Sequence, residues 1–307
     1  MSVVRYRIEH ETRYEHDGLA STSQHVACLT PRSLPHQALV CHWLDIDPEP
    51  AARQTRTDYF GNAVDQFSIL SPYTEMRVMS RSEVDIEAPQ RAVVPEKSPA
   101  WERVREQLQY HGRVPYPQAT EFSYASPYAP LGAEVQAFAR EVFEPGQPML
   151  EAAIALMHHI HEEFTFDPAA TSVATPLVRV LSERRGVCQD FAHLQIAAMR
   201  ALGLPARYVS GYLLTQPPAG KPRLIGADAS HAWVSVWSPD AIAGGHWVDL
   251  DPTNNRTAGE DYVTLAVGRD YSDVSPVRGV IHGGDAHTLN VAVTVAPVAE
   301  LPLEQAE

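Results

Sequence analysis

The chain reads Arg185-Gly186-Val187-Cys188-Gln189-Asp190-Phe191-Ala192-His193-Leu194 at the point where a loop turns into a predicted helix. We expect that helix to end near Gly203-Leu204-Pro205, because a glycine followed by a proline stops a helix. The first turn of a helix has unpaired N–H groups and the positive end of the helix dipole, and both stabilise a thiolate more than a thiol. Cys188 is therefore a candidate nucleophile, and the alternative is a small buried residue that begins a core helix.

The helix alone cannot activate this cysteine. A free cysteine titrates near ~8.5, so only a few per cent is thiolate at neutral pH. Lowering that pKa to ~4 requires about 6 kcal/mol, at ~1.36 kcal/mol per pH unit. A helix N-terminus contributes at most ~2 kcal/mol of this. A nucleophilic Cys188 therefore predicts a cationic histidine close beside it.

A histidine follows at the start of a predicted strand that covers residues 231–237. The small and branched residues at positions 232, 234 and 236 form the core face of that strand. His231 should then point toward the helices or into a cleft. On its own, such a histidine is more often a hydrogen-bonded structural residue.

A carboxylate ends the next predicted strand, at residues 246–251. Asp251 could accept the Nδ1 proton of His231 and hold the other ring nitrogen toward Cys188. Asp249 shares the same strand face and is the competing acid. A nucleophile, a base and an orienting acid together have the chemistry of a catalytic triad.

The pattern of apolar residues predicts a mixed α+β protein. Residues 3–88 alternate with period two between turn signals, which indicates short antiparallel strands and a small sandwich. Helical spacing then governs residues 132–204, where Leu150, Ile154, Met157, Ile160 and Phe164 form one buried face. Further strands are expected at 207–214, 231–237, 246–251, 262–267 and 288–295. We predict an N-terminal β-sandwich domain at 1–90, a linker with helices at 91–148, and an α+β domain at 149–300.

Three segments together resemble the core motifs of bacterial transglutaminase-like proteins: 186–194 around Cys188, 230–234 around His231, and 247–254 around Asp251. The order of the three residues and their close spacing match that family. Leu29-Thr30-Pro31-Arg32 and Asp58-Tyr59-Phe60-Gly61-Asn62 also resemble the β-rich domain that precedes this core in bacterial members.

The resemblance implies a papain-like α+β core in the second half of the chain. It implies that Cys188 is the nucleophile, His231 the base and Asp251 the orienting acid. Asp251 is favoured over Asp249 because the family's triad carboxylate precedes a Pro-Thr pair. The backbone N–H of Cys188 is the expected donor to the oxyanion.

We therefore expect a cysteine enzyme that acts on peptide or glutamine-type amides through a thioester, with hydrolysis as the favoured outcome. One alternative is protein-glutamine γ-glutamyl transfer to an amine. Another is a non-catalytic scaffold that binds peptides. The loop at 215–222 is expected to border the substrate cleft.

Composition narrows the function further. The net charge of −14 disfavours nucleic-acid and membrane-surface partners, so the expected partner is a peptide or protein substrate. Three cysteines do not suggest a disulfide framework, and the first residues lack a signal-peptide pattern, which favours a cytoplasmic protein. The oligomeric state is not indicated.

We expect no cofactor and no metal. The spacing of His25, Cys28, Cys41 and His42 fits no standard zinc pattern. His193 lies five residues from Cys188 on the predicted helix, about 140° around its axis, so the two should not share an ion.

Overall fold

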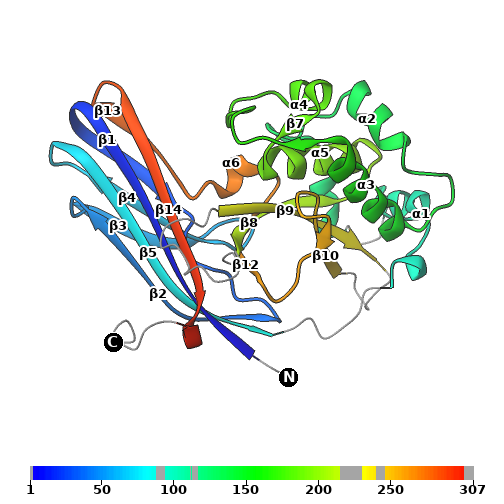
Figure 1. Cartoon of the computed structure of the whole chain (residues 1–307), viewed down its shortest axis with the longest axis horizontal. Coiled ribbons are helices and arrows are strands. Elements are labelled where there is room, and N and C mark those ends of the chain that lie inside the picture. Colours follow the sequence, from blue (N-terminus) through cyan, green and yellow to red (C-terminus); the bar gives the residue numbers. More distant parts are fainter. Residues whose placement is uncertain are drawn as a thin grey trace.

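The computed structural model describes residues 3–87, 94–110, 112, 117–214, 230–239 and 246–300. A large curled sheet forms one half of the molecule, and helices packed on a smaller sheet form the other (Figure 1). The predicted α+β class is confirmed. The seven strands of the curled sheet are β1 (Val3–Ala27), β2 (Gln37–Asp47), β3 (Ala52–Thr57), β4 (Ala63–Ile69), β5 (Tyr73–Glu87), β13 (Val277–Gly283) and β14 (His287–Pro297).

These seven strands form four long antiparallel rows, here called tracks: β1 alone, β5 with β4, β14 with β13, and β2 with β3. Along its length, β1 pairs on one side first with β5 and then with β4. On its other side it pairs first with β14 and then with β13. Outside them, β2 pairs with β5 and β3 pairs with β4. The register of β1 shifts between Glu15 and Ala20, and the tracks bend over at the upper left of Figure 1. The sheet therefore folds back on itself.

The inner faces of the two folded parts share one hydrophobic core. This core contains residues from both ends of the tracks, including Ile8, Phe67, Ile69, Val84 and Val293. The sequence predicted a sandwich, and the chain reaches its two layers with one curled sheet instead of two stacked sheets. Period-two alternation identifies the buried face of a strand but does not show whether a bend or a break separates the layers.

The other half packs helices on a five-stranded sheet in the order β11-β10-β9-β8-β12. These strands are β8 (Ala206–Leu213), β9 (Ser230–Ser238), β10 (His246–Asp251), β11 (Arg256–Thr257) and β12 (Tyr262–Gly268). The helices are α1 (Trp101–Gln107), α2 (Ala133–Arg140), α3 (Met149–Glu163), α4 (Leu177–Glu183), α5 (Cys188–Ala201) and α6 (Tyr271–Val274). Short 3-10 turns lie at Pro95–Lys97, Gln118–Ser123 and Val298–Glu300, and β6 (Thr165–Phe166) pairs with β7 (Arg185–Gly186).

The segment 91–148, which we expected to be a linker, contributes to the helical core. Val104, Leu108, Val135 and Phe138 are buried there with residues of α3 and α5. The last predicted strand, 288–295, lies within β14 and pairs with β1 in the curled sheet. The predicted second domain at 149–300 placed that strand in the wrong sheet, because alternation gives no information about a strand's partner.

Two buried amide side chains join the halves at β12, the edge strand of the smaller sheet. Gln37 accepts the N–H of Thr264 at 2.8 Å and donates to its carbonyl at 2.7 Å. Asn62 makes the same pair of bonds with Val267, at 2.9 and 2.8 Å. The amides thus bind backbone groups on the free edge of β12, where no further strand pairs.

Within the described residues, none of the helices has both the length and the apolar content needed to cross a bilayer.

Candidate active site

Cys188 is the first residue of α5 and is half-buried. The turn before it is held by Asp190, whose carboxylate accepts the backbone N–H of Val187 at 2.9 Å and the hydroxyl of Thr171 at 2.7 Å. Burial raises the pKa of Asp190, and these two hydrogen bonds oppose that effect. A Cβ atom on Gly186 would lie 2.7 Å from this carboxylate. Gly186 is therefore needed to let Asp190 fix the turn that presents the cysteine.

His231 and Asp251 come together as expected, but through a different ring nitrogen. The Nε2 atom of His231 lies 2.6 Å from Oδ2 of Asp251. The expectation that Nδ1 faces Asp251 is wrong, since the sequence does not reveal which edge of the ring a strand residue turns inward. The amide nitrogen of Asn254 also lies 3.3 Å from Nε2, so Nδ1 is the nitrogen left for the hydrogen bond with Cys188 that helps to raise the pKa of this imidazole.

Asp251 is fully buried, and five hydrogen bonds hold its carboxylate. Besides His231, Oδ2 accepts the amide of Asn254 and the hydroxyl of Tyr262, each at 2.7 Å. Oδ1 accepts the backbone N–H groups of Thr253 and Asn254. Sequence reasoning missed Asn254 and Tyr262. The local turn after Asp251 could have indicated the first, because Asp commonly accepts N–H groups two and three residues ahead.

The electrostatics of the pair favour a charged imidazole beside a charged carboxylate. Burial by itself would lower the pKa of His231, but hydrogen bonds with Asp251 and Cys188 and the charges of both raise it to about 10. Burial would raise the pKa of Asp251, but its hydrogen bond with His231, together with those from Asn254 and Tyr262, brings it below the usual range. The arrangement can therefore hold a proton on His231 next to the sulfur of Cys188.

Asp249, the competing acid, has a different neighbour. Its Oδ2 atom accepts the indole N–H of Trp233 at 3.2 Å. Trp233 is fully buried and packs edge-on against Tyr262. The indole passes so close to Gly211 that a Cβ atom there would lie 2.4 Å from it. Asp249 thus orients an aromatic side chain beside the site, and Asp251 is the carboxylate on His231.

His193 does not turn toward Cys188. It is buried, stacks on Tyr128, and accepts the N–H of Tyr271 on Nε2 at 3.2 Å. Burial lowers its pKa to about 4. The structure therefore places it as a hydrogen-bonded core residue of α5.

The described residues contain no cluster of three or more His, Cys, Asp or Glu side chains that could hold a metal ion. The predicted cleft loop at 215–222 lies outside the described residues.

Comparison with known proteins identifies a family that covers most of the chain. A model of the transglutaminase-like superfamily matches residues 136–252, and one of the bacterial transglutaminase-like N-terminal region matches residues 6–85. An uncharacterized protein of Mycobacterium tuberculosis is 39% identical over 297 residues, which cover 95% of this chain and 93% of that protein.

Two further similar proteins differ in how much of this chain they cover. A protein-glutamine gamma-glutamyltransferase of Pseudomonas aeruginosa is 34% identical over 110 residues, or 35% of this chain and 16% of that protein. The crystal structure of a candidate cysteine protease from Cytophaga hutchinsonii superposes with a TM-score of 0.72 at 20% identity, covering 97% of this chain and 92% of that one. The latter likeness extends the shared fold across both halves.

Proposed function

Because the chain belongs to the transglutaminase-like superfamily, we propose that it is a cysteine enzyme that hydrolyses peptide or glutamine-type amides through a thioester. The observation that carries this proposal is the single imidazole of His231, which hydrogen-bonds to both Asp251 and Cys188. A nucleophile, a base and an orienting acid in this order of contact are what amide acyl transfer requires.

In the first half-reaction, the thiolate of Cys188 attacks the carbonyl carbon and the C=O electron pair moves onto oxygen. The N–H of Cys188, at the start of α5, donates to that oxyanion. The intermediate then collapses, the C–N bond breaks, and the amine or ammonia leaves with the proton of the His231 imidazolium. A thioester on Cys188 and a neutral His231 remain.

In the second half-reaction, His231 takes a proton from water as the water oxygen attacks the thioester carbonyl. The C–S bond breaks, the carboxylic acid leaves, and the thiolate–imidazolium pair is restored. Asp251 keeps Nε2 occupied throughout, so that Nδ1 performs each proton transfer. Five hydrogen bonds prevent the carboxylate from rotating away between the steps.

Transfer to an amine in place of water is the second candidate. This candidate is supported by the similarity, over 110 residues, to a relative named as a protein-glutamine gamma-glutamyltransferase. Chemically, an amine would replace water in the second half-reaction, and the same residues would act. The alternative from a different class is a scaffold that binds peptides without turnover. The five hydrogen bonds that hold Asp251 argue against it, because a site without catalytic activity would not need its carboxylate held in place.

Mass spectrometry of a peptide library incubated with the protein, with and without an added primary amine, separates these candidates. Cleavage, deamidation and amine incorporation each change the peptide mass differently. We expect hydrolysis products that disappear in Cys188→Ala and persist in Cys41→Ala, a matched loss of a half-buried thiol outside the site. Products of equal yield from the Cys188→Ala protein, or none from the native protein, would remove the proposed activity.

A further inference from the structure

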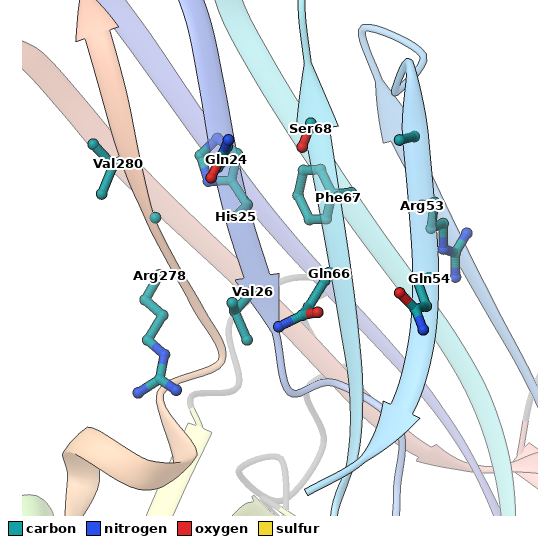
Figure 2. A pocket seen from close by; sticks show the side chains of 12 residues that line it. Gln24, His25, Val26, Arg53, Gln54, Gln66, Phe67, Ser68, Arg278 and Val280 are labelled. Atoms are coloured by element: carbon teal, nitrogen blue, oxygen red, sulfur yellow. The ribbon is translucent and has the colours of Figure 1, made fainter.

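Part of the curled sheet is hollowed on the face turned away from its own core, where Val26 packs against the core of the helical half. The hollow is open on one side and has a volume of about 730 Å³ over β13, β1, β4 and β3 (Figure 2). Two rows of side chains, each running across the four strands, line it. The register places Val280, Gln24, Ser68 and Ala52 in one row and Arg278, Val26, Gln66 and Gln54 in the next. His25 and Phe67 lie between the rows and point to the inner face, where their rings stack.

The charges on this face differ from those on the rest of the sheet. Where β1 runs beside β5, the outer face carries both acidic and basic side chains, and some form opposite-charge pairs, such as Arg5 with Asp85 and Arg7 with Glu83. Such pairs suit a solvated surface. The two rows of the hollow contain no aspartate and no glutamate, in a chain of net charge −14.

Three arginines lie in or beside the hollow. Arg53 lines it and is already paired with the carboxylate of Asp65 at 3.0 Å. Arg278 is exposed and donates a hydrogen bond to the carbonyl of Ser272, and among the described residues it has no carboxylate partner. Arg56 lies two residues from Gln54 on the exposed strand β3 and shares its face. The guanidinium groups of Arg278 and Arg56 are therefore able to bind a carboxylate from another molecule.

The glutamine side chains can both donate and accept hydrogen bonds, as an extended peptide backbone requires. Across four strands each row spans roughly 14 Å, about the length of four extended residues. Elsewhere the acidic surface of the chain repels a negatively charged segment.

Two successive hydrogen bonds connect the hollow, through α6, to the helix that presents Cys188. Arg278 donates to Ser272 of α6, and the neighbouring Tyr271 donates its N–H to His193 of α5. His193 lies five residues after Cys188, about 7.5 Å along the helix. In Figure 1, α6 lies between the curled sheet and the helical half.

We propose that this face binds an extended acidic segment of the polypeptide whose amide Cys188 attacks. The inference rests on the proposed function for the identity of that polypeptide. The hollow thereby selects substrates in which carboxylates flank the reactive amide at a distance.

Binding is tested without turnover in the full-length Cys188→Ala protein. The probes are two fluorescein-labelled peptides that contain one glutamine, flanked by four glutamates in the first and by four lysines in the second. We expect the acidic peptide to bind at least about tenfold more tightly, with an affinity that falls as salt rises. Equal binding of the two peptides would overturn the proposal.

Three substitutions locate the binding site. Arg278→Glu and Gln66→Glu should each weaken binding of the acidic peptide by about tenfold. Gln66→Glu adds a carboxylate without disturbing the contact of Arg278 with α6. Arg103→Glu reverses an exposed charge on α1 and should leave binding unchanged. If all three variants behave alike, the acidic peptide binds elsewhere and the proposal fails.

The two proposals fail separately. If the native protein turns over no peptide while the acidic peptide still binds this face, the proposed activity is wrong and the proposed binding by the hollow is supported. If the protein turns over amides with no preference for acidic flanking residues, the proposed activity is supported and the proposed binding by the hollow is wrong.

Discussion

Tyr262 donates a hydrogen bond of 2.7 Å to Oδ2 of Asp251, the same oxygen that lies against His231. Burial raises the pKa of Tyr262, so the phenol is in its protonated, donating form. Tyr262 begins β12, the strand whose backbone Gln37 and Asn62 hold from the other half of the molecule. A continuous set of contacts thus runs from the curled sheet to the carboxylate of the candidate triad.

Replacing Tyr262 by phenylalanine should lower amide turnover about tenfold, which corresponds to roughly 1.4 kcal/mol. The lost hydrogen bond helped to keep the pKa of Asp251 low, so that pKa rises. Activity should then fall on the acid side at a higher pH than in the native protein. Turnover measured between pH 4 and 8 checks both effects.

Tyr73→Phe is the matched control for that variant. It removes one buried tyrosine hydroxyl, which donates to Ser23 at 2.8 Å within the curled sheet. It should leave the pH profile in place. If both variants shift the profile equally, the effect of Tyr262→Phe is a general loss of stability and not an effect on Asp251.

Asn62→Ala should loosen the joint between the halves. It leaves the N–H and carbonyl of Val267 buried without their partner, at a cost of about 2–4 kcal/mol. Urea unfolding of this variant should begin at a lower concentration than for Asn290→Ala, which shortens an exposed side chain on β14. Equal stability of the two variants would show that water replaces the amide at no cost.

The stability of the fold should fall as the pH drops from 6.5 to 4. The unfolded chain binds a proton on histidine near ~6.5, whereas burial lowers the pKa of folded His193 to about 4. Acid therefore favours the unfolded state, by up to about 3 kcal/mol for this residue. His193→Gln keeps an acceptor for the N–H of Tyr271 and removes the titration, so its unfolding free energy should vary less over this range.

His282→Gln serves as the comparison, because that imidazole is exposed on β13. It should leave the pH dependence of urea unfolding as it is in the native protein. The buried His10, whose pKa burial also lowers to about 4, remains in both variants and accounts for part of the acid sensitivity that persists.

The order of helices and strands along the chain was predictable because most of the sequence patterns that indicate them lie within each element. The stop after α5 and the buried face of α3 follow from residues within each helix, and both helices lie where the spacing placed them. The partners of strands were not predictable in the same way. β14 alternates as clearly as any strand of the second half, yet it pairs with β1 almost three hundred residues away.

The same limit applies to the candidate site. Cys188, His231 and Asp251 are marked by their local sequence, and the structure brings His231 against both of the others. The ring nitrogen that meets Asp251 depends on how β9 and β10 twist past each other. Tyr262 reaches Asp251 from a strand on the far side of β8, so that nothing near it in sequence indicates its role.

The charge of His231 sets the upper pH limit of the site. Its folded pKa is raised to about 10, above the ordinary value near ~6.5. The stabilisation from its pairing is therefore fully present below pH ~6.5 and is lost as the pH rises through about 10.

The most direct test of an activated thiolate is the rate at which iodoacetamide labels each cysteine at pH 6. Burial raises the pKa of Cys28 to about 12 and also raises that of Cys41, so both should react slowly. Cys188 should react fastest in the native protein and lose that advantage in His231→Ala. A Cys188 that reacts no faster than Cys41, or a rate that His231→Ala leaves unchanged, would contradict the account.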